Sequence, residues 1–182
     1  MRTAYLDIET NYVGTYTDQR LFRDSKNHQI TVIGIRVIEG EKESFVQLVG
    51  NEATREALLR ALDGVGRIVT YNGRSKPDSV KGYVGFDFPV IAAQLGVVLD
   101  REFKHKDLCP ECWKSGFWGG QKAVEQALGL KRKPGSERDG AWAGETWKQY
   151  QKTGNQRLLE ELLEYNREDV FMLRRIDEAL KR

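Results

Sequence analysis

Four carboxylates in well-separated parts of the chain are the residues best suited to do chemistry. Asp7 and Glu9 lie near the start, Asp87 near the middle and Asp169 near the end, each within an otherwise apolar segment. Burying several carboxylates together is costly unless a cation neutralises them. If the fold brings the four together, they predict a metal site.

The first two acids lie on a predicted strand, Thr3–Glu9. Strand alternation places Asp7 and Glu9 on one face, opposite the apolar face formed by Ala4, Leu6 and Ile8. The two acidic side chains therefore point the same way, about 6.5 Å apart along the strand.

The other two acids belong to predicted helices. Apolar residues recur at helical spacing from Gln156 to Leu180, and Tyr165 and Asp169 lie on or beside that stripe. Asp87 precedes a short apolar helix predicted over Phe88–Leu95. Pro89 is tolerated in its first turn because an N–H is not needed there.

Each acidic motif alone is weak evidence for a functional site, and the ordered set of three motifs is more specific. The chain holds a second D-x-E at Asp100–Glu102 and a second Y-x-x-x-D at Tyr83–Asp87, in a charged link and a glycine-bracketed loop. Each acid by itself could be an ordinary cap or a salt-bridged carboxylate. A D-x-E on the first strand, an F-D before a mid-chain helix and a Y-x-x-x-D in the last helix favour one shared site.

This ordered set resembles the tyrosine-bearing branch of the DEDD exonucleases, within the ribonuclease-H-like superfamily. It is most similar to the small domains related to the proofreading exonuclease of family B DNA polymerases. The segments that carry the resemblance are Tyr5–Thr10, Tyr71–Gly73, Phe86–Asp87, Gly119–Leu130 and Tyr165–Val170. The chain departs from the family at Lys76–Gly85, which separates the Asn-Gly and Phe-Asp pairs. The Cys109–Cys112 segment is also outside the motif set.

The resemblance implies a metal-dependent 3′-to-5′ exonuclease that hydrolyses single-stranded nucleic acid, with DNA favoured, to 5′-mononucleotides. It implies two divalent cations, Mg²⁺ or Mn²⁺, whose oxygen ligands come from Asp7, Glu9, Asp87 and Asp169. Tyr165 would orient the attacking water. Substrate contacts would come from Thr10, Asn72, Phe86 and Lys122.

Two other functions remain open on the same residues. One is a ribonuclease-H-like endonuclease, and the other is a nucleic-acid-binding module without turnover. Tyr165 favours the exonuclease by family analogy. Clustered negative charge argues against a pure binder, because it repels phosphate. The sequence does not choose between DNA and RNA ends, and it identifies no helicase or polymerase partner.

The composition indicates one domain over residues 1–182. Of the 182 residues, 40% are hydrophobic and 31% charged, and no apolar run is long enough to span a membrane. The chain enters a predicted strand at once, which predicts a cytoplasmic protein without a signal peptide. The net charge of +2 does not by itself indicate nucleic acid.

Local basic groups could follow a phosphate backbone or could be solvated surface charge. They are Arg74 with Lys76, Lys104–Lys106, Lys131–Lys133 and Arg174–Arg175.

The expected fold is α/β, a ribonuclease-H-like mixed sheet with helices on both faces. An antiparallel meander of three strands is followed by parallel strands. The expected strands are Thr3–Glu9, Gln29–Ile38, Ser44–Val49, Arg67–Tyr71 and Phe103–Leu108. The expected helices are Glu52–Leu62, Phe88–Leu95, Gln121–Leu128, Glu145–Lys152 and Gln156–Leu180. Residues 11–28, 76–85 and 131–140 are expected loops, and we expect 76–85 to lie over the substrate cleft.

Cys109 and Cys112 have the C-x-x-C spacing of zinc sites and redox pairs. Structural zinc takes four ligands, and the only histidines are His105 and the distant His28. We therefore expect two reduced thiols in a loop rather than a zinc site at His105, Cys109 and Cys112.

Overall fold

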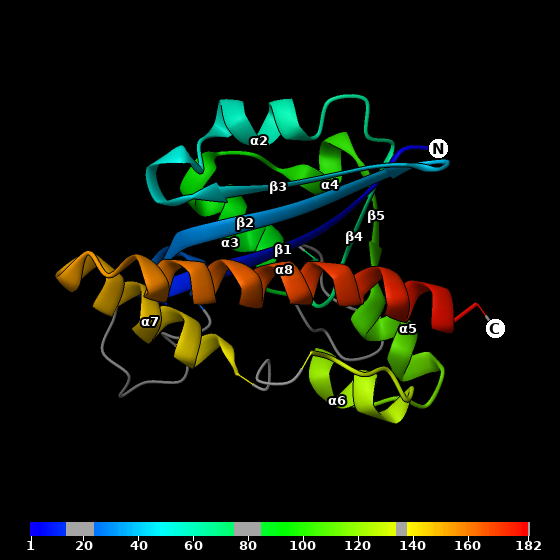
Figure 1. Ribbon diagram of the computed structural model, residues 1–182. Helices are drawn as coiled ribbons and strands as arrows, with labels where there is room; N and C mark the ends of the chain where they lie inside the picture. The colour runs from blue at the N-terminus through cyan, green and yellow to red at the C-terminus, as the bar shows by residue number, and fades with distance from the viewer. Residues whose placement is uncertain (14–23, 75–84, 134–137, 182) are drawn as a thin grey trace.

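In the computed structural model, the chain folds into a five-stranded mixed sheet with helices on both faces (Figure 1). The structure describes residues 1–13, 24–74, 85–133 and 138–181. The strands are β1 (Thr3–Tyr12), β2 (His28–Glu39), β3 (Lys42–Val49), β4 (Arg67–Thr70) and β5 (Lys104–Asp107). Their order is β3-β2-β1-β4-β5, which places β1, with Asp7 and Glu9, at the centre of the sheet.

The strand pairing confirms the expected fold class. β1 pairs with β2 and β2 with β3 in antiparallel fashion, and Asp7 lies opposite Gly34. β1 pairs with β4 and β4 with β5 in parallel. The register between β1 and β2 shifts between Glu9 and Thr10. Such an irregularity bends and twists a strand locally, here directly beside the acidic pair.

Three helices cover one face of the sheet: α2 (Arg55–Ala61), α3 (Asp87–Leu95) and α4 (Leu99–Glu102). The β1 face formed by Ala4, Leu6 and Ile8 packs into a cluster with residues of these helices, among them Leu58, Phe88, Ile91 and Leu99. α2 starts later than the expected Glu52, because the Thr54 side chain caps the helix by accepting from the Ala57 N–H at 3.2 Å.

Four helices cover the other face: α5 (Leu108–Lys114), α6 (Gln121–Ala127), α7 (Gly140–Thr153) and α8 (Gln156–Ala179). α8 runs along the sheet (Figure 1), and α7 packs against both α8 and β1. The buried stripe of α8 includes Leu162, Tyr165, Val170, Leu173 and Ile176. Residues of this stripe pack with β-strand residues in two hydrophobic clusters. This packing holds α8, and with it Asp169, against β1.

The expectation of a loop at the cysteines is wrong, because that segment forms α5. The Asp107 carboxylate caps the helix by accepting from the Cys109 N–H at 3.1 Å. Pro110 lies in the first turn, where a missing N–H costs no hydrogen bond. The acidic cap followed by an early proline was therefore a helix signal.

α7 likewise begins at Gly140 rather than at the expected Glu145. The Asp139 side chain accepts from the Trp142 N–H at 2.9 Å and starts the helix earlier. The charged link at Asp100–Glu102 is part of α4, and short 3₁₀ turns occur at Ser25–Asn27 and Gly50–Glu52. Residues 14–23, 76–84 and 134–137 of the expected loops, with the basic Lys76, lie outside the described part of the chain.

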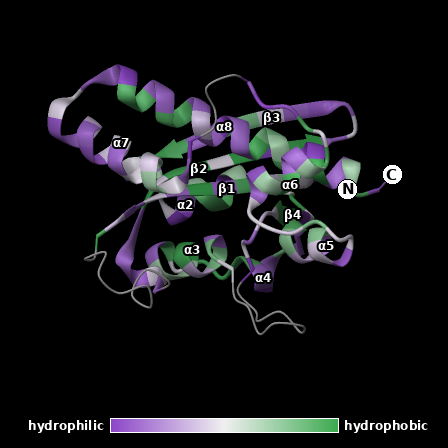
Figure 2. Cartoon of the chain, turned by 90° about the horizontal axis from the view of Figure 1, so that it is seen from below, coloured by the Kyte–Doolittle hydropathy of each residue, from purple (hydrophilic) through white to green (hydrophobic). Residues whose placement is uncertain are grey.

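The hydropathy of the chain follows these layers. β1 and β2 are largely green in Figure 2, whereas the edge strand β3 is purple over part of its length. Of the helices that the structure describes, none combines the length and the apolar character needed to cross a membrane.

Candidate metal centre

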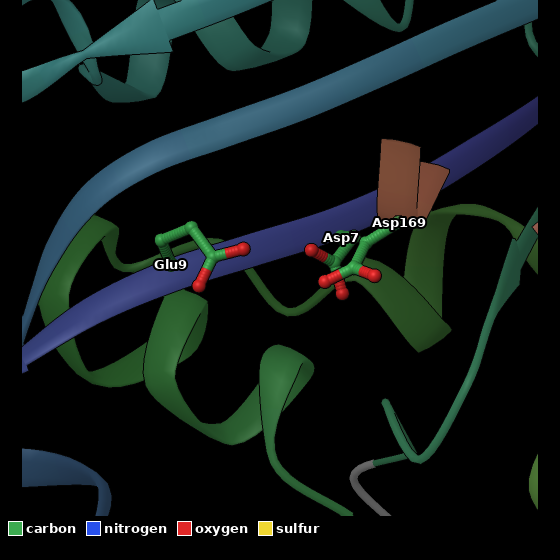
Figure 3. Close-up of side chains that lie close together, drawn as sticks. All are labelled: Asp7, Glu9 and Asp169. Atoms are coloured by element: carbon green, nitrogen blue, oxygen red, sulfur yellow. The ribbon is translucent and has the colours of Figure 1, made fainter. Parts of the chain in front are cut away.

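Three carboxylates converge on the face of the sheet that α8 covers. Asp7 and Glu9 come from β1 and Asp169 from α8, and each offers an oxygen within 4.8 Å of the others (Figure 3). Glu9 and Asp169 are only 5% and 7% exposed. The fold thus brings together three of the four predicted acids from opposite ends of the chain.

Burial changes the electrostatics of this group. It raises the pKa of Asp7 and Glu9 well above ordinary carboxyl values, and repulsion among the three acids raises both further. Lys122 opposes this shift at both residues. The acids must therefore hold protons or be neutralised by a cation.

Asp87, the fourth predicted acid, is the first residue of α3 and is buried. Burial raises its pKa, and the charge of Asp7 is the next largest cause. The two carboxylates therefore repel each other. Among the described residues, the group with ligand oxygens within 4.8 Å contains Asp7, Glu9 and Asp169 without Asp87. Asp87 therefore stands beside the three acids rather than among them.

The Tyr165 hydroxyl lies at the same site. Tyr165 is one turn before Asp169 on α8, and the Lys122 ammonium donates to its oxygen at 2.9 Å while lying 4.4 Å from the ring centroid. Burial raises the pKa of Tyr165, and so do the charges of Asp169, Glu9 and Asp7. The hydroxyl therefore keeps its proton at neutral pH. Lys122, predicted as a substrate contact, also donates to the Arg138 carbonyl.

A polar contact that the sequence reasoning missed fixes Asp7. Asn166 is fully buried and donates to the Asp7 Oδ2 atom at 3.0 Å. Gln47 of β3 in turn donates to the Asn166 Oδ1 atom at 3.0 Å. A Cβ on Gly34 would lie 2.2 Å from that Oδ1 atom, so only glycine leaves room for the amide. Asn166 adjoins Tyr165 in the last motif, but its partner is set by tertiary packing.

Two of the predicted substrate contacts meet at a buried histidine. The Thr10 hydroxyl lies 3.1 Å from the His28 Nδ1 atom. The Phe86 ring packs edge-on against the same imidazole with centroids 4.7 Å apart. His28 is only 1% exposed. It therefore links the end of β1 to the segment that precedes Asp87.

Asn72, the remaining predicted substrate contact, lies beside the Phe-Asp pair despite the insertion. The Phe86 N–H donates to the Asn72 carbonyl at 2.6 Å, and the Gly85 N–H donates to the Arg74 carbonyl at 2.9 Å. Asn72 has a φ of 68°, and its own N–H donates to Asp107 at 2.7 Å. The fold thus restores the adjacency that the family pattern has in sequence.

Most of the basic groups form ion pairs instead of an open cationic surface. Arg74 pairs with Asp107 at 3.1 Å and Lys106 with Asp177 at 2.6 Å. Arg132 approaches the candidate site itself, because its Nη1 atom lies 2.5 Å from the Asp169 Oδ1 atom. The sequence grouped Arg132 with its lysine neighbours, as phosphate contacts or as solvated surface charge, and missed this partner.

The fold does not bring His105, Cys109 and Cys112 together as a zinc site. Among the described residues, the group of three metal-ligating side chains that lie close together is the acidic one. The His105 Nε2 atom lies 2.9 Å from the Thr70 hydroxyl. Burial raises the pKa of Cys109 to about 12 and that of Cys112 to about 11. Both thiols are therefore protonated at neutral pH.

The acidic site fits a hard divalent cation. Its donor set is entirely carboxylate oxygen, which suits Mg²⁺ or Mn²⁺. Within the described part of the chain, the Asp87 Oδ2 atom is buried without a hydrogen-bond partner. A buried acceptor of this kind is costly unless a cation or a donor satisfies it.

Comparison with protein families matches residues 4–181 to the RNase H superfamily. No curated protein matches the chain. The family match contains every candidate site residue, and the observed mixed sheet agrees with the fold expected for this superfamily. It supports a nuclease-type function on nucleic acid that uses divalent cations. Because the match extends over nearly all of the sequence, the chain belongs to the ribonuclease H superfamily.

Proposed function

We propose that the protein is a metal-dependent exonuclease that removes 5′-mononucleotides from the 3′ end of single-stranded nucleic acid, with DNA favoured over RNA. The observation that carries this proposal is the position of Tyr165. Its protonated hydroxyl lies one helical turn from Asp169 and beside the acids of β1. A neutral hydroxyl at an acidic centre is suited to orient a water molecule rather than to hold a metal.

The proposed cation ligands are Asp7, Glu9, Asp87 and Asp169, and the proposed cations are Mg²⁺ or Mn²⁺. When bound, a pair of such ions activates water and stabilises the leaving oxygen of a phosphodiester. Asn166 holds the Asp7 carboxylate in place by donating to its Oδ2 atom. Asp87 approaches from the opposite layer, because α3 lies on the other face of the sheet from α8.

The roles proposed for the remaining residues follow from their contacts. Lys122 donates to the Tyr165 oxygen, so the hydroxyl hydrogen is left for another acceptor. Thr10 and Phe86 are held on either side of His28 and would line the path of the 3′-terminal nucleotide. Asn72, held in a left-handed turn, would contact the same nucleotide.

The polarity assay tests this function. A 5′-labelled single-stranded DNA, incubated with Mn²⁺, should shorten stepwise from its 3′ end, and a 3′ phosphate should slow the reaction sharply. Matched RNA and double-stranded substrates test the substrate preference. Asp7→Asn and a chelator are the negative controls.

Two results of this assay would reject the exonuclease. Efficient cutting of a circular single strand would identify an endonuclease. Binding of the labelled strand without any cleavage would identify a binding module without turnover.

A further inference from the structure

Arg132 connects the candidate metal centre to a second buried acid that no part of the proposed mechanism uses. Glu125 of α6 is 1% exposed, and Arg132 donates to it through Nε at 2.5 Å and Nη2 at 2.6 Å. The third nitrogen, Nη1, lies 2.5 Å from the Asp169 Oδ1 atom. One guanidinium therefore bridges Glu125 and the proposed ligand Asp169.

The two halves of this bridge differ in quality. The Glu125 half is a bidentate fork of two aligned hydrogen bonds, the strong geometry for an arginine and a carboxylate. The Asp169 half is a single short contact, from Nη1 to Oδ1 at 2.5 Å, and one contact holds a guanidinium less firmly than a fork of two. Of the two contacts of Arg132, the contact with Asp169 is therefore the one that can break.

The chain around Arg132 is fastened to α8. The Arg175 guanidinium donates to the Lys131 carbonyl at 2.7 Å, and the Lys133 N–H donates to Glu168 at 3.3 Å. Gln121 adds a bond from α6 to the Asp169 carbonyl at 3.0 Å. Backbone contacts therefore hold the guanidinium at this site independently of the Asp169 carboxylate.

We propose that Arg132 is a built-in counter-ion of Asp169 that competes with the divalent cation for this carboxylate, while Glu125 retains the guanidinium beside the site. The inference rests on the metal site of the proposed function. Arg132 then acts as a positioning residue through Asp169 and sets the cation affinity. A guanidinium released from Asp169 but still held by Glu125 would lie beside the substrate phosphate.

Calorimetric titration with Mn²⁺, without nucleic acid, measures this competition directly. Arg132→Gln should lower the Kd for Mn²⁺ by about tenfold, the size of one charge-assisted contact. Glu125→Gln should raise the Kd, because the full charge of Arg132 then faces Asp169. Lys133→Gln is the matched control: it removes the same charge from the next residue, whose side chain is 67% exposed and pairs with Glu164.

The double variant Glu125→Gln/Arg132→Gln separates direct contact from long-range charge, and it removes the buried charge of Glu125 together with its partner. It leaves the net charge unchanged, so a lower Kd than in the wild type isolates the lost contact with Asp169. A wild-type Kd in the double variant, or weaker binding in Arg132→Gln, overturns the inference.

Failure of the proposed function gives a different result. Tight Mn²⁺ binding that Asp7→Asn abolishes, without exonuclease activity, would reject the exonuclease and leave the Arg132 competition intact. A wild type that binds no Mn²⁺ would overturn the competition together with the metal site.

Discussion

The pairing of Tyr165 with Lys122 determines what the tyrosine can do. The ammonium donates to the hydroxyl oxygen at 2.9 Å, and burial with three nearby carboxylates raises the pKa of Tyr165. The phenol is therefore a hydrogen-bond donor at neutral pH and is not a base. A donor fixed at this point positions an acceptor, which is the role we propose for it toward water.

Tyr165→Phe tests this role at the scale of one atom. The ring should keep its contacts with Trp142 and Lys122, so the melting temperature and the Mn²⁺ response should remain close to those of the wild type. Turnover should fall by about a hundredfold to ten-thousandfold, the usual cost of losing one positioning or acid-base contact. Single-turnover kinetics measure this fall. Full activity would reduce Tyr165 to a packing residue.

The residues that spacing alone could reveal are those whose motifs lie within one element. Asp7 and Glu9 share a strand face, and Tyr165 and Asp169 share a helix face, so each pair was predictable from its period. Asn166, Glu125 and Arg132 were missed because their partners come from other elements. Nothing in the sequence around Arg132 distinguishes it from its exposed neighbour Lys133.

The close approach of β2 to α8 is the contact between elements that most directly supports the site. Gly34 lies opposite Asp7 in the sheet register. A Cβ there would lie 2.2 Å from the Asn166 Oδ1 atom and 2.7 Å from the Val170 Cγ2 atom. Because Gly34 of β2 has no side chain, Asn166 of α8 can reach Asp7.

Gly34→Ala should push α8 away from the sheet. We expect a loss of about 1–3 kcal/mol in the free energy of unfolding, typical of overpacking, measured by denaturant titration. Mn²⁺ affinity should fall as well, because Asp7 loses its Asn166 contact. Gly140→Ala is the control, since a Cβ there meets nothing within 4 Å. Equal stability of the two variants would contradict this account.

The elements were more predictable than their ends. The main strands and the last helix followed from alternation and from an apolar stripe. α5 was missed and the start of α7 was placed too late, because both starts depend on the capping acids Asp107 and Asp139, whose signal is a single side chain. One hydrogen bond is enough to decide where a helix begins, and it leaves little trace in a hydrophobic pattern.

For the whole molecule, the buried acids impose a pH dependence. The pKa values of Asp7, Glu9 and Asp87 are raised in the folded state, mainly by burial. At these three acids the folded protein therefore binds more protons than the unfolded chain above pH of about 4, the ordinary carboxyl value. Without divalent cations, stability should decrease as pH rises from that value through the raised pKa values.

A cation that binds the deprotonated acids should reverse this loss. We expect millimolar Mg²⁺ to raise the melting temperature more at pH 8 than at pH 5, because protons compete with the metal at the lower pH. Thermal scans with Mg²⁺ or with a chelator measure the difference. Asp7→Asn should lose most of the gain at pH 8. Equal shifts of the melting temperature at both pH values, or in the wild type and Asp7→Asn, would show that Mg²⁺ acts at another site.

A hydrogen bond from the Gly85 N–H to the Arg74 carbonyl joins the two residues that flank the insertion. These two residues meet before the chain reaches Asp87, and a Cβ on Gly85 would lie 2.3 Å from the Asn72 carbonyl oxygen, so the junction is tight. The entropy of closing a loop grows slowly with length, by about 0.6 kcal/mol per doubling. Residues 75–84 can therefore lengthen, shorten or change sequence during evolution without moving the acid beside them. Changes of sequence in this segment then leave the chemistry of the centre the same.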